Sequence, residues 1–471
     1  MSVLSNLIRA ASSRKHQSAV VISGTMLLLL PVMASASMAD NSTRPNFLII
    51  MADDISWTSF GCANPQAFTR TPNIDSLAKQ GMSFANFHCS MALCVPVRSE
   101  LYTALLPPTS GVISGNPAPS GTFKNVNDYL GELGYVTGRA GKNHFKSKTA
   151  PKSIPGFSGN CNADKTEWSM DGVKSFIGNA VAEKKNFCAF ICSVEAHHPW
   201  TMGNQQHFPA TSMTLPPHMV DTPKTREVMS RHAAEVELFD EQVGAALRLL
   251  KEMDLDKNTV VIVLSEQGMA LPQGKFSIYD FGNRALCVMR WPGHIAAGSI
   301  TPAVSMYCDI VPTLVDLAGG KPPHGIDGRS MRKALMGEPV SHRKYAYLVY
   351  GNYQRAIVDD CFKLVWTPSG KEFSGPTVGK NGSKLYTQAW AEWLEAAKND
   401  PDAKLKVERV LKHPLYELYN IKEDPYELVN LASDPAHAAR LKGMISDLKA
   451  EIATLKDSMK TNGGDEGDDA E

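Results

Sequence analysis

Three short apolar stretches of this 471-residue chain each end in side chains suited to catalysis or metal binding. They are residues 46–51, followed by Asp53 and Asp54; residues 187–194, followed by Glu195 to Trp200; and residues 259–264, followed by Ser265 to Gly268. Continuous apolar runs of this length are typical of strands that are buried on both faces. Open α/β sheets bind their ligands at the carboxyl ends of the strands. The three runs therefore predict a single site along one sheet edge.

Helical patterns alternate with these runs. Residues 226–253 place apolar side chains, among them Val236, Phe239 and Val243, at spacings of three and four, which indicates an amphipathic helix. Strands that alternate with helices predict an α/β fold in which helices cover both faces of a large central sheet.

The pattern changes after about residue 340. Apolar stretches at residues 345–350, 356–358 and 363–366 predict short antiparallel strands, and a final amphipathic helix is predicted over residues 435–456. A polar, glycine-rich loop lies between them.

The domain organisation follows from this change. We expect a large catalytic domain over residues 44–340 and a small C-terminal α+β subdomain over residues 341–456. The acidic, glycine-rich residues 457–471 are typical of a solvated, disordered tail.

Residues 1–39 have the features of an export signal. Basic residues precede an apolar stretch over residues 19–33, and small residues precede Asp40. The stretch is too short and too interrupted to predict a stable membrane anchor, so we expect a periplasmic or secreted protein. The formal net charge is zero. Without a concentrated basic stripe, the composition argues against a nucleic-acid partner.

The chain contains nine cysteines. Export would permit disulfide bonds, and Cys161 with either Cys188 or Cys192 is a candidate pair. Because the count is odd, at least one cysteine stays unpaired. We expect this to be Cys94.

Cys94 begins a Cys-x-Pro-x-Arg pentad, Cys94 to Arg98, which is a weak motif on its own. Its neighbours along the chain give it weight. In order, these are Asp53-Asp54, Thr71-Pro72-Asn73-Ile74-Asp75, Gly141-Lys142-Asn143-His144, the His-x-Pro pattern at His197, Glu266-Gln267 and Gly274-Lys275. Together they resemble the sulfatase family over residues 44–432, most closely its bacterial polysaccharide and glycosaminoglycan branch. The resemblance implies an alkaline phosphatase-like fold and oxidation of Cys94 to formylglycine (3-oxoalanine).

The resemblance also implies a metal site. Its ligands would be Asp53, Asp54, Glu266, Gln267 and the modified Cys94. Because the side chains offer oxygen ligands, calcium is favoured and magnesium is the alternative. This chain departs from the family at Glu266-Gln267, where Asp followed by Asn, His or Gln is usual.

Two further departures lie in or near the pentad. Val97 stands where the family usually has Ser or Ala. Ala104 stands where Gly is usual, and Gly tolerates backbone angles that Ala does not.

The remaining catalytic roles are carried over from the family. Lys142 is expected to contact the formylglycine and the sulfate oxygens, His144 a formylglycine hydroxyl, and Lys275 the sulfate. His197 is expected to donate a proton to the leaving group, although the adjacent His198 is an alternative. Arg98 is expected to brace the nucleophile loop. The position of Trp57 and Trp200 beside the motifs leaves sugar stacking and core packing both open.

This chemistry fits the hydrolysis of sulfate esters on a sulfated poly- or oligosaccharide, after a cytosolic maturation enzyme has oxidised Cys94 before export. The nucleophile attacks sulfur, positive groups neutralise the sulfate oxygens, and an acid protonates the departing alcohol. One alternative is a phosphoester or phosphonate hydrolase on the same fold. Another is a non-catalytic protein that binds sulfated glycans and in which Cys94 stays unmodified. The sugar recognised would depend on loops such as residues 146–170 and 369–400.

Overall fold

The computed structural model describes residues 44–115, 123–145, 152–153, 170–339, 341–368 and 384–458. All of them belong to the second of two compact units, residues 41–471. The expected export signal, most of the acidic tail and Cys161 lie outside the described residues. Among the helices that the structure describes, none is long and apolar enough to cross a membrane.

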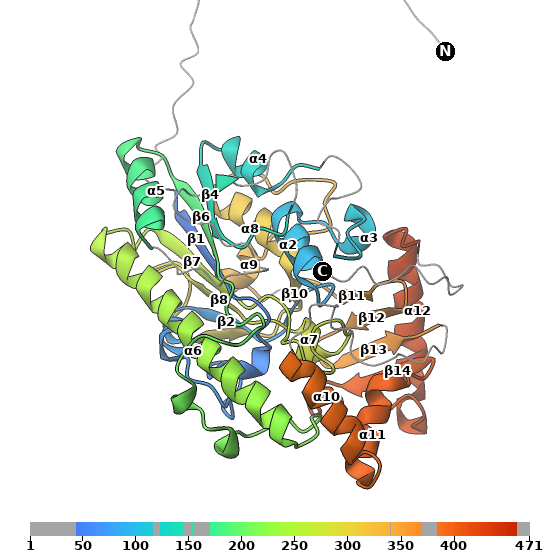
Figure 1. Ribbon diagram of the computed structural model, residues 1–471. Coiled ribbons are helices and arrows are strands. Elements are labelled where there is room, and N and C mark those ends of the chain that lie inside the picture. Colours follow the sequence, from blue (N-terminus) through green and yellow to red (C-terminus); the bar gives the residue numbers. More distant parts are fainter. Residues whose placement is uncertain are drawn as a thin grey trace, which may run out of the picture. The chain divides into compact units, whose positions relative to one another are not determined.

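The main sheet has eight strands in the order β5-β4-β6-β1-β7-β8-β2-β9 (Figure 1). The strands are β1 (Asn46–Met51), β2 (Met82–Phe84), β4 (Val136–Gly141), β5 (Lys152–Ser153), β6 (Phe187–Cys192), β7 (Thr259–Leu264), β8 (Cys287–Arg290) and β9 (Ser299–Thr301). The sheet is mixed, because β8 runs antiparallel to β7 and β2 whereas the other pairs are parallel.

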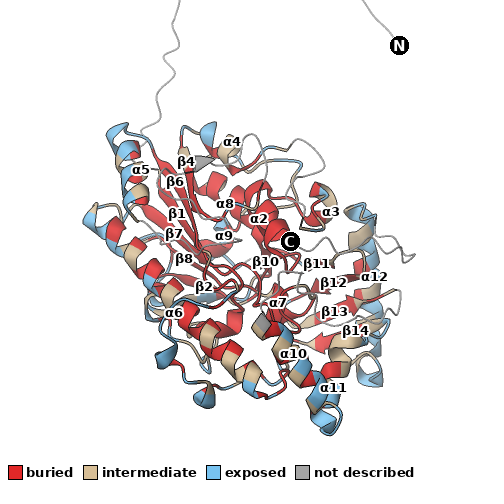
Figure 2. Ribbon diagram, viewed as in Figure 1, coloured by how far each residue is buried: buried red, intermediate tan, exposed pale blue. Residues whose placement is uncertain are grey.

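The three apolar runs form adjacent central strands. β1 pairs in parallel with both β6 and β7, and Met51 lies opposite Cys192 on one side and Leu264 on the other. Every residue of these strands is buried, as Figure 2 shows for the centre of the sheet. The polar residues that follow each strand therefore leave the sheet along one edge, as the sequence predicts.

Helices cover both faces of this sheet (Figure 1). Leu48 and Ile50 point into a core shared with α1 (Pro72–Gln80), α5 (Met170–Ala182) and α6 (Pro223–Glu252). On the other face, residues such as Phe47 and Ile49 pack against α2 (Cys94–Thr103), α4 (Val126–Gly131) and α8 (Ile310–Leu317). The two-sided burial explains why the central strands are apolar at every position and do not alternate.

A second, antiparallel sheet follows in the order β11-β12-β13-β14. Its strands are β11 (Ala346–Tyr350), β12 (Gln354–Val358), β13 (Phe362–Trp366) and β14 (Tyr416–Asn420). The final helix, α12 (Ala438–Thr454), adds Met444 and Leu448 to the core of this sheet. β11, β12, β13 and α12 lie where the sequence predicts them, whereas β14 was not predicted as a strand.

The remaining elements are short. They are β3 (Phe87–His88), which pairs with β10 (Ser305–Met306); α3 (Pro107–Ser110), α7 (Asp280–Asn283) and α9 (Arg332–Leu335); and the 3₁₀ turns Trp57–Ser59, Gln205–His207, Ala210–Ser212, Tyr307–Asp309 and Pro435–His437.

The expectation of a loop over residues 369–400 is wrong in its second half. Residues Lys384–Ala396 form α10, which is followed by α11 (Pro401–Leu411). Trp393 of α10 is buried, and its Nε1 donates to Thr225 Oγ1 of α6 at 2.7 Å. The packing of α10 on α6 therefore stabilises this helix. The sequence does not reveal this tertiary contact, because the stretch before α10 is polar and rich in glycine.

The described cysteines are all free thiols. Cys188 and Cys192, the expected partners of Cys161, lie fully buried in β6 and belong to the core beside α2. The structure thus gives no support to a disulfide at either position. Both behave as small apolar core residues.

Candidate active site

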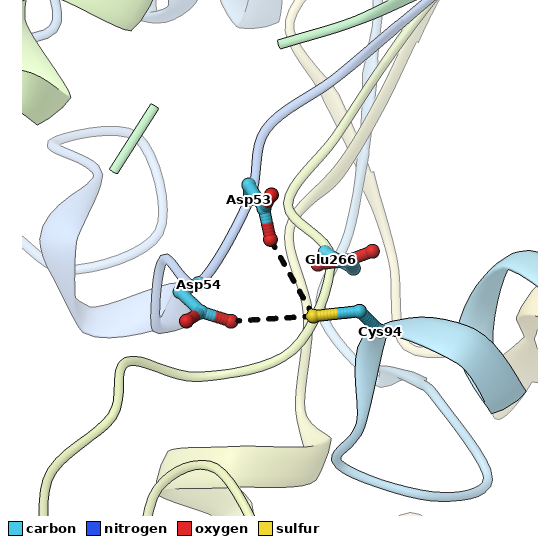
Figure 3. Close-up of side chains that lie close together, drawn as sticks. All are labelled: Asp53, Asp54, Cys94 and Glu266. Carbon is cyan, nitrogen blue, oxygen red and sulfur yellow. Dashed lines mark hydrogen bonds between the residues drawn. The ribbon is translucent and has the colours of Figure 1, made fainter. Parts of the chain in front are cut away.

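Four side chains that could hold a metal ion meet at the carboxyl edge of the main sheet. Asp53 and Asp54 follow β1, Glu266 follows β7, and Cys94 is the first residue of α2 (Figure 3). Their ligand atoms all lie within 4.8 Å of one another. Cys94 Sγ lies 3.6 Å from Asp53 Oδ1 and 3.7 Å from Asp54 Oδ1. All four side chains are fully buried.

The turn after β1 explains how two consecutive carboxylates can face one sulfur atom. Neighbouring side chains of a strand point to opposite faces. Asp54 leaves the strand conformation with a left-handed φ of 54°, which is uncommon for a residue other than glycine. The loop after β6 holds Asp53, because Asp53 N donates to Glu195 O at 2.8 Å and Ala196 N donates to Asp53 O at 2.6 Å.

Three buried cations surround these carboxylates. Lys142 Nζ, just beyond β4, lies 2.7 Å from Asp53 Oδ2, and Lys275 Nζ lies 3.2 Å from Asp54 Oδ2. Arg98, one turn into α2, places Nε 2.5 Å from Glu266 Oε1. Arg98 Nη1 also donates to the carbonyl of Lys142 at 3.2 Å. Arg98 therefore links Glu266 to the backbone at Lys142, and its expected role in bracing the nucleophile loop stays a prediction.

Charge and burial set the ionisation of the carboxyl groups. Burial alone would raise the pKa of Asp53, but Lys142 and the other cations hold that pKa well below its usual value. Burial raises the pKa of Asp54, although Lys275 opposes the shift. Burial also raises the pKa of Glu266 to about 8, against the opposing charge of Arg98. A divalent cation would favour the ionised form of all three groups.

The residues present fit a hard divalent cation. The amide oxygen Oε1 of Gln267 is buried and accepts no hydrogen bond, and the carboxylate of Glu266, which is paired with Arg98, lies in the same cluster. Buried polar atoms without partners are costly and mark the place of an unseen water or ion. Oxygen atoms of carboxylates and amides are the ligands that calcium and magnesium prefer. Gln267 also places Nε2 3.1 Å from Cys94 Sγ, which connects it to the same centre.

His197 follows β6 and directs its ring into the site. Its Nε2 lies 3.4 Å from Lys275 Nζ and 3.8 Å from Asp54 Oδ2. Its Nδ1 lies 2.6 Å from the carbonyl oxygen of His198. Because a carbonyl can only accept, Nδ1 carries a proton, and Nε2 is the nitrogen available for proton exchange. Burial, Lys275 and Lys142 lower the pKa of His197 well below its usual value.

Two further histidines, His198 and His144, lie near these residues. The half-buried His198 ring packs against His197 in a tilted arrangement, with ring centroids 4.4 Å apart. His144 adopts a left-handed φ of 42°. Burial and the charges of Lys142 and Arg98 lower the pKa of His144 to about 2, so its ring is neutral. The structure thus brings Arg98, Lys142, His197 and Lys275 to the carboxylates that lie beside Cys94. The individual roles of these residues and of His144 stay predictions.

Other motif residues turn out to be structural. Trp57 and Trp200 are buried at 6% and 3% exposure, so core packing, not sugar stacking, accounts for both. In the Thr-Pro-Asn-Ile-Asp element, the backbone N–H groups of Asn73 and Ile74 donate to the carboxylate of Asp240 on α6 at 3.1 and 2.8 Å. That element anchors the start of α1.

Ala104 ends α2 with a φ of 59°, so the family's usual glycine at this position has a conformational reason.

A model of the sulfatase family matches residues 45–320, more than half of the chain. The chain belongs to the sulfatase family. An ulvan-active sulfatase of Formosa agariphila is 28% identical to this sulfatase over 443 residues, which cover 89% of this chain and 82% of that protein. This sulfatase is therefore a sulfuric ester hydrolase.

Solved structures show the same fold at lower identity. A structure described as a complex with its substrate, D-glucosamine-2-N,6-O-disulfate, has a TM-score of 0.69 at 19% identity and covers 89% of this sulfatase and 100% of that chain. A phosphonate monoester hydrolase of Agrobacterium radiobacter has a TM-score of 0.62 at 18% identity, with 88% and 97% covered. This sulfatase therefore has the alkaline phosphatase-like fold expected from its motifs.

Proposed function

We propose that this sulfatase hydrolyses sulfate esters of a sulfated poly- or oligosaccharide, with a formylglycine made from Cys94 as its nucleophile and a bound divalent cation. The observation that carries the proposal is the position of Cys94. Its Sγ lies at the start of α2 and contacts Asp53, Asp54 and Gln267 at 3.6, 3.7 and 3.1 Å. The ulvan-active relative supports a sulfated polysaccharide as the substrate class.

An oxidised residue 94 explains the surroundings of this cysteine better than a thiol does. Burial, with the charge of Glu266, raises the pKa of the Cys94 thiol well above its usual value, so the unmodified side chain is a poor nucleophile. When residue 94 is a hydrated aldehyde, it supplies one hydroxyl that attacks sulfur and a second whose deprotonation releases sulfate.

Asp53, Asp54, Glu266 and Gln267 would hold the cation, which supplies positive charge for the sulfate and the nucleophile. We favour calcium over magnesium because the protein side chains of the site present oxygen atoms and calcium accepts irregular oxygen cages. Residue 94 lies inside the same cluster.

The cationic side chains then neutralise the sulfate. Lys142 and Lys275 are buried, and their ammonium groups lie beside the carboxylates of Asp53 and Asp54, respectively. Such preorganised charge is most effective where water is excluded. His197 protonates the departing sugar oxygen from Nε2, and a sulfate beside Lys275 and His197 favours the protonated ring electrostatically.

Maturation precedes folding in this proposal. Cys94 has no exposed surface, so a modifying enzyme could not reach it in the folded chain. We propose that a cytosolic maturation enzyme oxidises Cys94 before export, and that the mature protein acts in the periplasm or outside the cell.

The substrate class is tested by assaying the purified protein on a panel of sulfated saccharides and on aryl phosphates and phosphonates, with Cys94→Ala as the control. We expect turnover of sulfated saccharides that Cys94→Ala abolishes. Preferential turnover of phosphonate or phosphate esters would support the second candidate, which the fold of the Agrobacterium hydrolase favours. Saccharide binding without turnover would support a non-catalytic glycan-binding protein.

A further inference from the structure

The carbonyl oxygen of Asp54 has a partner that no sequence motif marks. His232, in the middle of α6, is completely buried. Its Nε2 lies 2.9 Å from the carbonyl oxygen of Asp54, across 178 residues of sequence. A carbonyl oxygen can only accept a hydrogen bond, so Nε2 of His232 carries the proton and donates.

This hydrogen bond acts on a strained point of the backbone. Asp54 is held at a φ of 54°, a left-handed conformation that is uncommon for a residue with a Cβ. The turn is what directs the Asp54 carboxylate to Cys94 Sγ at 3.7 Å and to Lys275 Nζ at 3.2 Å. A donor on the Asp54 carbonyl therefore stabilises the one backbone geometry in which both carboxylates face the same centre.

Trp200 packs against the His232 ring. The two rings meet edge to face, with centroids 6.3 Å apart and an interplanar angle of 74°. Trp200 Nε1 donates to the carbonyl oxygen of Ala196 at 2.9 Å, in the loop that carries His197. Ala196 N in turn donates to Asp53 O at 2.6 Å. α6 is thus connected to the backbone of both aspartates through fully or nearly fully buried groups.

We propose that His232 is a positioning residue for metal binding. By donating to the Asp54 carbonyl, it holds the left-handed turn that presents the Asp54 carboxylate to the cation. This inference rests on the proposed metal site. His232 does not bind the cation itself but holds Asp54, which does. Removing a residue that orients a metal ligand in this way typically lowers metal affinity roughly 10- to 100-fold.

The test measures calcium affinity by isothermal titration calorimetry on the chelator-treated mature protein, with magnesium titrated in parallel. His232→Phe keeps an aromatic ring against Trp200 but removes the donor, whereas His232→Gln keeps an N–H donor on a side chain of similar reach. Ser230→Ala is the matched control, because it removes a buried hydrogen bond from α6 to the Phe208 carbonyl without touching Asp54.

We expect His232→Phe to weaken cation binding roughly 10- to 100-fold, and His232→Gln and Ser230→Ala to bind like the wild type. We also expect excess calcium to restore most of the kcat of His232→Phe, which a general folding defect would not show. If His232→Phe does not fold, His232→Leu replaces it. The proposal then predicts that His232→Leu loses calcium affinity and that His232→Gln retains it.

Two outcomes would overturn the inference, and they are distinguishable. Wild-type affinity in His232→Phe would refute the positioning role and leave the metal site intact. Failure of the wild type to bind either cation would refute the proposed metal site, and the role of His232 with it.

Discussion

Lys142 and Asp53 form an ion pair from which water is excluded: Nζ lies 2.7 Å from Oδ2, and neither side chain has exposed surface. The carboxylate belongs to the candidate metal site after β1, and the ammonium group comes from just beyond β4, which β6 separates from β1 in the sheet. Lys142 therefore has two expected roles. It stabilises Asp53 in the absence of metal, and we propose that it neutralises sulfate during turnover.

Lys142→Met should destabilise the metal-free protein strongly. The substitution leaves the Asp53 charge buried without its closest partner, and breaking a buried pair in this way costs about 3–5 kcal/mol. Urea unfolding in the presence of a chelator measures the loss, and added calcium should recover part of it. Lys185→Met, which breaks an exposed pair with Glu183 at 2.9 Å, should change stability little. Equal effects of the two substitutions would contradict the account.

Calcium should stabilise the wild type but not a variant that lacks the amide oxygen of Gln267. A ligand that binds only the folded state adds about 2.7 kcal/mol at 100 times its dissociation constant. We expect Gln267→Leu to lose most of the calcium-induced rise in Tm and most of the activity. Gln354→Leu, which alters a buried glutamine of β12 that bonds Thr367, should keep the calcium response. A full response in Gln267→Leu would exclude it as a ligand.

The central strands, and the sheet edge at which the candidate site lies, could be predicted because burial on both faces leaves a clear apolar signal. β1 and β7 have the predicted bounds, and the register of Met51 with Cys192 and Leu264 explains why their polar successors meet. The order of the motifs then supplied the remaining candidates. The sequence could not show which of these residues contact one another.

Contacts between segments that are far apart in the chain could not be predicted from the sequence patterns. Arg98 reaches Glu266 across the site, and a spacing of 168 residues carries no sign of it. His232 was overlooked because a lone histidine on an apolar helix face is usually a core residue. The helix α10 was missed because its stability comes from packing on α6 through Trp393, whereas its own sequence follows a polar, glycine-rich stretch.

His197→Ala should slow substrates with poor leaving groups more than those with good ones. A general acid contributes roughly 10²- to 10⁴-fold when the departing group needs a proton. We expect a large fall in kcat for sugar sulfates and a much smaller fall for nitrophenyl sulfate. His198→Ala is the matched control, since its ring packs against His197 and His198 is not among the clustered candidate metal ligands. Equal losses on both substrates in His197→Ala would refute the acid role.

Protonation of His88 should lower the stability of the protein in mild acid. Burial lowers the pKa of this fully buried histidine to about 4, against an opposing effect of Asp280. Its neutral form therefore stabilises the fold fully above the unfolded pKa near 6.5. That contribution, up to about 3 kcal/mol, is lost as the pH falls from 6.5 towards 4.

His88→Gln removes this titration and keeps a donor for Asn86 Oδ1, the present partner of His88 Nε2. Urea unfolding at pH 7, 5.5 and 4.5 should show a smaller loss of stability in the variant than in the wild type. Parallel pH profiles for the two proteins would contradict the assignment.

The state of residue 94 decides the central claim most directly. Mass spectrometry of the tryptic peptide from Gln80 to Arg98, taken from active enzyme purified from its native host, distinguishes the aldehyde from the thiol. The account predicts formylglycine at residue 94 in a fraction that scales with specific activity. A peptide that contains only the Cys94 thiol, in enzyme that turns over sulfate esters, would contradict it.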